Sequence, residues 1–335
     1  MYVVDEDQYE RFDERNTIFA RSQWDTTCSC YGHRVDEKVK DIIAQNTPGY
    51  SRCDAALYLA SWTIYNTYEG AFSWKKLSST GGSPDTYLST PYEVELDILT
   101  ARVKRAAQFY GASLVGITHI DPRWIYSHNR QGMPVTIPDH FISAVVMAVE
   151  MNPVALATSP ALLGAAATGM GYSKMAFLIS CMGEFIRNLG YNAIQMGNDT
   201  ALSIPLAIDA GLGELGRNGL LINPQFGSRI RICKIFTDMP LIEDHHTDYG
   251  IGKTCIQCNK CAEACEVDAI SYEDTPTFDP ACPSNNPGVL KWPINAEKCY
   301  EFWCDNGGDC STCITACPFT RKTLGSSTPE SFWNR

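Results

Sequence analysis

The chain has 335 residues, of which 44% are hydrophobic and 19% are charged, and its 38 Asp and Glu against 27 Lys and Arg give a formal net charge of −11. This length fits about two domains, and the hydrophobic content excludes a chain that is disordered throughout. The acidic charge disfavours general binding to nucleic acid or to an anionic membrane surface.

The predicted elements begin with an irregular, partly helical unit over residues 1–90. A helix is expected over 92–111, where apolar residues recur at helical spacing and Gly111 stands where a C-terminal cap belongs. Strands are predicted at 112–120, 143–151, 192–197 and 229–239, and further helices at 173–190 and 200–211. Alternating helices and strands of this kind indicate a mixed α/β core.

One uncharged stretch, residues 151–173, is long enough to span a bilayer. Pro153 and Pro160 interrupt it, and it is rich in Ala, Gly, Ser and Thr rather than Leu and Ile. These features favour a buried loop and a packed helix over a membrane span. The polar, acidic start of the chain also lacks the apolar segment of a signal peptide.

Clustered cysteines mark a second module after about residue 241. Ten of the 15 cysteines lie between positions 255 and 317, whereas a disulfide framework would be spread over the chain. Residues 255–265 have the C-x2-C-x2-C-x3-C spacing of bacterial ferredoxins, which predicts ligation of [4Fe–4S] clusters. A second run ends in Cys317-Pro318.

Exchange of the fourth ligand between the two runs predicts two sites of four thiolates each. The first site is predicted to contain Cys255, Cys258, Cys261 and Cys317, and the second Cys265, Cys299, Cys310 and Cys313. Zinc or disulfides explain the spacing less well, because eight thiolates match two cubane clusters without remainder. Cys304 is the rival of Cys299 as a ligand. Two clusters in series predict that this module passes single electrons to another group.

The sequence GLGELG at residues 211–216 matches the glycine pattern of dinucleotide-binding loops. A helix is expected before it, where that fold requires a strand. We therefore interpret the glycines as room for the backbone to approach a large flat ligand. The residues expected to contact this cofactor are Ser203, Gly211, Gly213 and Gly216.

The segment from Gly197 to Leu241, together with the two cysteine runs, resembles the corrinoid-dependent reductive dehalogenases. GYSKMAF, GND, FGSRIR and KCYEFW are its most specific parts, and the resemblance extends from Arg11 to Phe319. It implies a nitroreductase-like, cobalamin-binding α/β core joined to a ferredoxin-like module with two [4Fe–4S] clusters. It also implies a base-off cobalamin without a histidine ligand. Cobalamin proteins that replace the nucleotide base with a protein histidine use the motif Asp-x-His-x-x-Gly, and residues 244–250 are one residue too long to match it.

The resemblance assigns Tyr172 as the proton donor, Arg231 as its cationic partner and Asn198 as a polar neighbour. Arg229, two residues before Arg231 on the same predicted strand, is the alternative partner. The pocket walls that the resemblance implies are Phe19, Thr168 and Trp303.

The predicted division is an N-terminal unit at 1–90, a cobalamin-binding core at 91–245, a two-cluster module at 246–320 and a tail at 321–335. The expected reaction is removal of halide from an organohalide by cob(I)alamin. The resemblance further implies export to the outer face of the cytoplasmic membrane, a small membrane-anchor subunit and a membrane electron donor. The alternatives are an epoxyqueuosine reductase, which would need a basic surface for tRNA, and a two-cluster electron carrier, which would not need the large α/β core.

Overall fold

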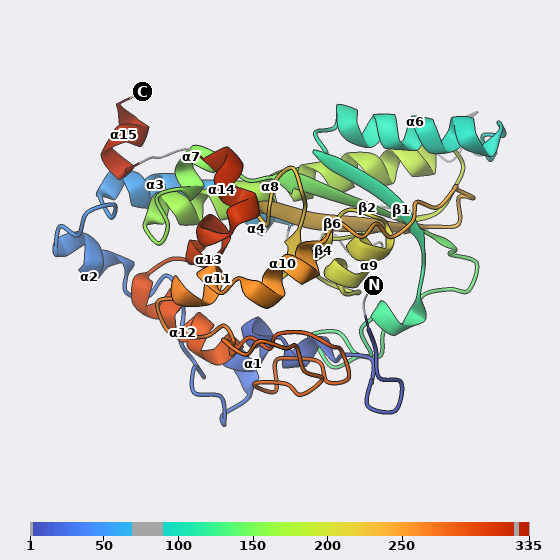
Figure 1. Cartoon of the computed structure of the whole chain (residues 1–335). Helices are drawn as coiled ribbons and strands as arrows, with labels where there is room; N and C mark the ends of the chain where they lie inside the picture. Colours follow the sequence, from blue (N-terminus) through green and yellow to red (C-terminus); the bar gives the residue numbers. More distant parts are fainter. Residues whose placement is uncertain (1–2, 69–89, 325–327, 335) are drawn as a thin grey trace.

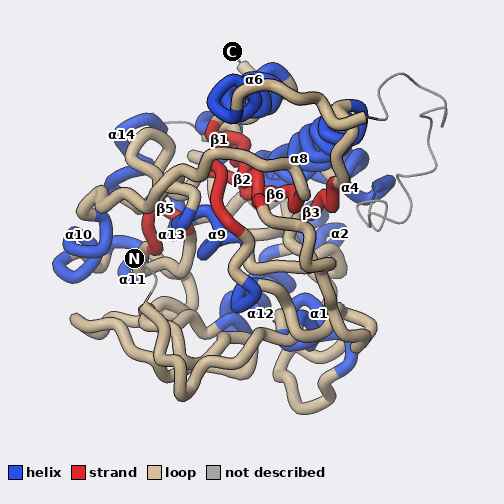
Figure 2. The backbone as a smooth tube through the Cα atoms, turned by 90° about the vertical axis from the view of Figure 1, so that its right-hand side faces the viewer, coloured by secondary structure: helices blue, strands red, loops and turns tan. Residues whose placement is uncertain are grey.

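A four-stranded antiparallel sheet lies at the centre of the computed structural model, which describes residues 3–68, 90–324 and 328–334 (Figure 1). Its strands follow the order β1-β2-β6-β3. Figure 2 shows these strands nearly end-on. Every neighbouring pair is antiparallel. The predicted fold class, a mixture of helices and strands, is therefore confirmed. Because the strand pairs are antiparallel, the fold is of the α+β type. The strands are β1 (Leu114–His119), β2 (Ser143–Glu150), β3 (Ala193–Met196) and β6 (Ile230–Thr237).

Helices cover both faces of this sheet (Figure 1). Helices α6 (Leu96–Phe109) and α8 (Leu162–Asn188) lie on one face, and α9 (Ser203–Asp209) lies on the other. Side chains alternate along a strand, so Val145 and Met147 of β2 pack with α6 and α8 while Ala144 and Val146 pack with α9. Strand β2 is buried on both faces, which explains its nearly continuous apolar sequence.

Helix α8 is longer than predicted, because it begins at Leu162 rather than at residue 173. The uncharged stretch 151–173 contains the short helix α7 (Pro153–Leu156) and the first turns of α8. By length and composition, α8 is the one helix in the described ranges that could cross a membrane, but 78% of its most apolar window is buried inside the protein. It is the core helix of this fold, which agrees with the packed helix expected there.

The other predicted elements are confirmed within a few residues. Gly111 and Gly190 have positive φ values of 102° and 82° after α6 and α8, as expected for glycines that end helices. The glycine segment 211–216 follows helix α9 and contains only a two-residue strand, so it does not form a dinucleotide-binding loop. That strand, β4 (Glu214–Leu215), pairs with β5 (Leu221–Ile222).

The described part of the N-terminal unit packs against the start of helix α8. Tyr50, Ala55 and Tyr58 share an apolar cluster with residues 161–166 at the start of α8. Residues 69–89, which complete the predicted unit, lie outside the described residues. The short elements here are η1 (Glu14–Asn16), α1 (Ile18–Trp24), α2 (Val39–Ala44), α3 (Arg52–Ser61) and α4 (Thr63–Tyr68), with η2 (Pro122–Trp124) in the core.

The cysteine-rich module consists of short helices joined by long loops, with the C-terminal helix beyond it. Ile314 and Leu324 pack with Met151 and Leu156 of the core, so apolar contacts join this module to α7. Its helices are α10 (Ile251–Gln257), α11 (Lys260–Glu263), α12 (Ala296–Asn306), α13 (Thr312–Ala316) and α14 (Pro318–Leu324), and α15 (Pro329–Trp333) follows.

Gly227 fixes the contact between this module and the core. Its φ is +60°, and an added Cβ would lie 2.2 Å from Oγ1 and 2.5 Å from the backbone nitrogen of Thr320. We predict that Gly227→Ala destabilises the holoprotein by more than about 1 kcal/mol, because both the conformation and the space exclude a side chain. The measurement is the midpoint of anaerobic chemical denaturation followed by circular dichroism.

Gly252→Ala is the matched control. Gly252 lies in α10, and nothing is within 4 Å of its added Cβ. Alanine there should leave the midpoint unchanged or raise it slightly, since alanine favours a helix more than glycine does. Equal midpoints for Gly227→Ala and Gly252→Ala would contradict the role given to Gly227.

Candidate functional site

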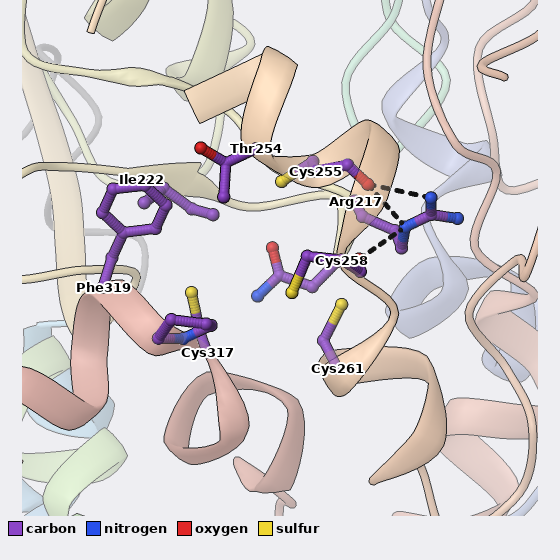
Figure 3. A pocket seen from close by; sticks show the side chains of 10 residues that line it. Arg217, Ile222, Thr254, Cys255, Cys258, Cys261, Cys317 and Phe319 are labelled. Atoms are coloured by element: carbon purple, nitrogen blue, oxygen red, sulfur yellow. Dashed lines mark hydrogen bonds between the residues drawn. The ribbon is translucent and has the colours of Figure 1, made fainter. Parts of the chain in front are cut away.

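Four cysteines surround one cavity next to α10, α11 and α14. They are Cys255, Cys258, Cys261 and Cys317, the four residues of the first predicted site, and Figure 3 shows their sulfur atoms pointing into the same space. Burial raises the pKa of the Cys261 thiol to about 12. A cluster bound here would therefore have to displace protons from the sulfurs, as metal binding to thiols does.

The four cysteines of the second predicted site also interact with one another. Burial, and then the neighbouring thiols of Cys299 and Cys310, raise the pKa of Cys313 well above its ordinary value. Burial, and then Cys310 and Cys265, raise the pKa of Cys299 to about 12. Cys261 of the first set packs in one cluster with Cys265 and Cys313 of the second, so the two sets of cysteines lie next to each other.

Cys304 lies in a different environment from Cys299. It packs in an apolar cluster with Cys28, Cys30 and Tyr300, away from the other predicted ligands. Within residues 3–68, 90–324 and 328–334, no three His, Cys, Asp or Glu side chains are grouped closely enough for a single metal ion. Four cysteine sulfurs that point into one cavity form the ligand set of a cubane cluster.

Tyr172 is half-buried near the middle of α8, where two predicted partners meet it. The Asn198 side-chain amide donates a hydrogen bond of 2.8 Å to the Tyr172 hydroxyl oxygen. The Arg231 guanidinium carbon lies 5.1 Å from the centre of the Tyr172 ring, and its Nη2 donates to the Thr168 hydroxyl at 3.2 Å. The structure thus brings four of the predicted site residues together.

Two glycines of α8 make this arrangement possible. An added Cβ on Gly171 would lie 2.9 Å from Cγ of Arg231, so only glycine lets this arginine approach the helix beside Tyr172. An added Cβ on Gly169 would lie 2.6 Å from Nε1 of Trp62. Trp62 stacks on Tyr172 with ring centres 5.0 Å apart.

Tyr172, Asn198 and Arg231 line one cavity of about 170 Å³ that is partly open to solvent. Ser203, one of the expected cofactor-contacting residues, lies in the same lining. The remaining lining residues are mostly apolar and are Ile204, Leu220, Leu221, Ser228, Ile230 and Ile232. An apolar wall that faces a few converging polar groups suits a large flat ligand with a reacting centre.

The three glycines expected beside the cofactor have another role. The space of an added Cβ is taken by the main-chain oxygen of His245 at Gly211, by that of Ile222 at Gly213, and by the Ile222 side chain at Gly216. The chain's own atoms therefore explain all three glycines. This corrects the expectation that Gly211, Gly213 and Gly216 make room for a ligand.

Arg229 is not available as the alternative partner of Tyr172. It lies just before β6 and forms an ion pair with Glu150 and hydrogen bonds with Thr323. Arg229 lies one residue before the first residue of β6, and these partners engage its guanidinium.

Phe19 and Trp303 contact each other, with ring centres 5.8 Å apart. Phe19 also meets Tyr300 of α12. Among the described residues, no ring contact joins Phe19 or Trp303 to Tyr172. The aromatic rings that do meet Tyr172 are Trp62 and Tyr65, the latter 5.1 Å away.

Comparisons with known proteins agree with this arrangement. Residues 121–241 match the family model of a reductive dehalogenase subunit, and residues 254–320 match that of a 4Fe-4S dicluster domain. The tetrachloroethene reductive dehalogenase of Sulfurospirillum multivorans is 31% identical over 344 residues, which cover 86% of this chain and 67% of that protein. The chain belongs to the reductive dehalogenase family.

Two further similarities concern another member and the fold. A tetrachloroethene reductive dehalogenase of Desulfitobacterium hafniense is 35% identical over 261 residues, which cover 65% of this chain and 47% of that protein. A solved reductive dehalogenase whose structure suggests a mechanism for B12-dependent dehalogenation has a TM-score of 0.69 at 24% identity, and the match covers 96% of this chain and 44% of that one. The chain spans 47% to 67% of the length of these curated relatives.

This reductive dehalogenase chain has two buried charged residues near Tyr172 that the sequence analysis missed. Lys234 of β6 is fully buried, and its Nζ donates to the main-chain oxygens of Gly197 and Asp199 and to the Ser203 hydroxyl, at 2.7, 3.1 and 3.0 Å. The ammonium thus holds the main-chain oxygens of the two residues that flank Asn198.

Asp309 is the second of these residues, and it precedes the predicted ligand Cys310. Neither of its carboxylate oxygens has a hydrogen-bond partner among the described residues. Burial raises the pKa of Asp309 to about 6, although the Arg231 cation lowers it. Asp309 therefore lies between the cysteine-rich loop and the groups around Tyr172. Lys234 had a signal in the sequence, because it is a charged residue within a predicted buried strand.

The Lys234 ammonium should make stability depend on pH. Burial lowers the pKa of Lys234 to about 8 from 10.5, against the influence of Asp199 and Glu14. Between these pH values the unfolded chain keeps a proton that the folded chain has lost, so the free energy of unfolding rises with pH. At 1.36 kcal/mol per pKa unit, the free energy of unfolding of the wild type should rise with pH by at most about 3 kcal/mol relative to that of Lys234→Met.

Chemical denaturation of both holoproteins at pH 7 and pH 10 measures this gain. The midpoint of the wild type should rise relative to that of Lys234→Met. For the control Lys253→Met, whose lysine side chain is 79% exposed, the difference from the wild type should stay constant. A constant difference for Lys234→Met as well would contradict the prediction.

Proposed function

We propose that this chain removes halide from an organohalide by reduction, with a base-off corrinoid and two [4Fe–4S] clusters. The reaction consumes two electrons and one proton, replaces the carbon–halogen bond by a carbon–hydrogen bond and releases halide. The observation that carries the proposal is the contact of Asn198 and Arg231 with Tyr172 in one cavity. Family membership supports the same reaction class.

Tyr172 is proposed to donate the proton from its hydroxyl. The Asn198 amide already donates to the Tyr172 oxygen, so that bond becomes stronger as negative charge develops there. The Arg231 cation beside the ring stabilises the same charge. Thr168 accepts a hydrogen bond from Arg231 and thereby helps to hold the guanidinium in place.

A corrinoid would be held against the apolar wall of this cavity and Ser203, and it supplies low-valent cobalt as the reductant of the carbon–halogen bond. No histidine is among the described residues that line the cavity. This composition supports binding without a histidine ligand. The B12-dependent dehalogenation named for a relative of the same fold also supports the corrinoid.

The two sets of cysteines are proposed to hold two [4Fe–4S] clusters that supply the electrons one at a time. The eight ligands are those predicted from the sequence, and the match to a dicluster domain supports the number of clusters. We further propose that the protein is exported, attached to the outer face of the membrane by a small anchor subunit and reduced by a membrane electron donor. Residues 91–245 would then form the corrinoid core and 246–320 the electron-transfer module.

The ligand assignment predicts different effects for two cysteines of α12. Anaerobically purified wild type should contain about eight irons per chain. Cys299→Ser should lose about half of them, because a thiolate of the second site is removed, whereas Cys304→Ser should keep them all. Iron and sulfide analysis measures both. Loss of iron in Cys304→Ser alone would mean that Cys304 is the ligand.

Halide release tests the proposed function. The holoprotein is incubated anaerobically with a reduced viologen and a chloroethene, a chloroalkane or a haloaromatic compound, and halide is measured. Release from at least one class supports the proposal. Reduction of epoxyqueuosine in tRNA without halide release from any class would favour the alternative enzyme, and electron transfer without either product would favour a carrier.

Tyr172→Phe should abolish most of this activity. Phenylalanine keeps the ring contacts with Trp62 and Tyr65 but removes the proton. General acid catalysis contributes about 10²- to 10⁴-fold, so a loss of kcat in that range is expected with unchanged iron and corrinoid contents. Arg231→Lys should lose less activity than Arg231→Ala, because lysine keeps a cation.

Tyr191→Phe is the control for this substitution. The Tyr191 hydroxyl donates to the main-chain oxygen of Tyr92, outside the cavity, and its removal should leave kcat unchanged. If Tyr172→Phe, replete in its cofactors, dehalogenates as fast as the control, another group supplies the proton.

A further inference from the structure

Arg217 is a fully buried arginine beside the first set of cysteines. It lies between β4 and β5, and Figure 3 shows it next to Cys255 and Cys258. Its Nε donates to the main-chain oxygens of Cys255 and Cys258 at 3.2 and 3.1 Å, and its Nη2 donates to that of Cys255 at 2.9 Å. The guanidinium therefore bonds to the loop that carries two of the four sulfurs.

The other side of the guanidinium holds a neighbouring segment. Nη1 donates to the main-chain oxygens of Ser271 and Glu273 at 2.9 and 2.7 Å. The Trp292 ring lies under the guanidinium, with its centre 4.6 Å from Cζ. Every donor nitrogen of Arg217 is thus used, and each acceptor is a main-chain carbonyl.

Arg217 differs in this respect from the other buried arginines. Arg21 and Arg229 are as deeply buried, but Arg21 pairs with Asp25 and Glu297, and Arg229 pairs with Glu150. Within the part of the chain that the structure describes, no carboxylate forms an ion pair with Arg217. A buried charge without an opposite charge is costly, so a negative group in the adjacent cavity would compensate it.

We propose that Arg217 is a positioning residue that holds the Cys255–Cys258 loop and supplies the counter-charge of the first cluster. The ligands of this cluster are Cys255, Cys258, Cys261 and Cys317. The positive charge of Arg217 raises the reduction potential of the cluster. The inference rests on the cluster content of the proposed function. Four thiolates give a [4Fe–4S] site a net negative charge, and reduction adds one electron. A fixed cation in a water-excluded site stabilises the reduced form more than the oxidised form.

The test is a redox titration of the anaerobic holoprotein with dithionite, followed by electron paramagnetic resonance. Cys258→Ser, which alters one ligand, identifies the signal of this cluster. At the midpoint of the wild type, Arg217→Met should lower the ratio of reduced to oxidised cluster at least tenfold, about 59 mV for a one-electron couple. Arg217→Lys should stay within tenfold of the wild type, because it keeps the charge.

Two controls separate a buried cation from any nearby cation. Lys260 is exposed and directly precedes the ligand Cys261, so water screens its charge and Lys260→Met should shift the ratio less than tenfold. The second cluster of the same protein should also shift less than tenfold in Arg217→Met. Amide hydrogen exchange over residues 255–258 and 271–273 should increase in both Arg217 variants, because the fork of hydrogen bonds is lost.

An unchanged potential in Arg217→Met, or equal shifts in both clusters, would overturn the inference. If Arg217→Met binds no iron at this site, Arg217→Lys decides alone, and a shift beyond tenfold in that variant overturns it. A wild type without [4Fe–4S] clusters would instead refute the cofactors of the proposed function. Neither measurement requires turnover, so a failure to release halide leaves this test intact.

Discussion

The close contact of strand β6 with helix α8 is the constraint on which the rest of the site depends. Gly171 lets Arg231 reach the helix surface beside Tyr172. The same helix turn presents Gly169 to Trp62, which stacks on the Tyr172 ring. A side chain at either glycine would push away a group that surrounds the phenol. The placement of the site residues therefore depends on the packing of the core.

Buried charges are the second feature of this architecture. Lys234 holds the turn that carries Asn198, Arg217 holds a cysteine loop, and Asp309 lies between the second cysteine run and Arg231. Each is expensive to bury, because it loses hydration. All three lie around the two sulfur sites and the phenol, where a fixed charge would serve the proposed electron and proton transfer.

The sequence was sufficient for the parts of this molecule that have local signatures. The ferredoxin spacing predicted which sulfurs gather around one cavity, and the apolar strand 143–151 predicted the doubly covered β2. Arg217 and Trp62 could not be found in this way, because their roles depend on partners far away in the chain. Lys234 did have a local signal, a charge in a predicted buried strand, but its partners could not be read from the sequence. The glycines at 211–216 were misinterpreted for the same reason, since the atoms that fill the space beside them come from other segments.

The most direct test of the account follows the hydrogen that replaces the halogen. The holoprotein is reduced in deuterated water with an organohalide that it accepts, and the product and electron consumption are analysed together. The account requires one deuteron at the carbon that lost the halogen, one halide released and two electrons consumed for each product molecule. Halide release without deuterium at that carbon, or without electron consumption, would contradict reductive dehalogenation with a proton from an exchangeable group.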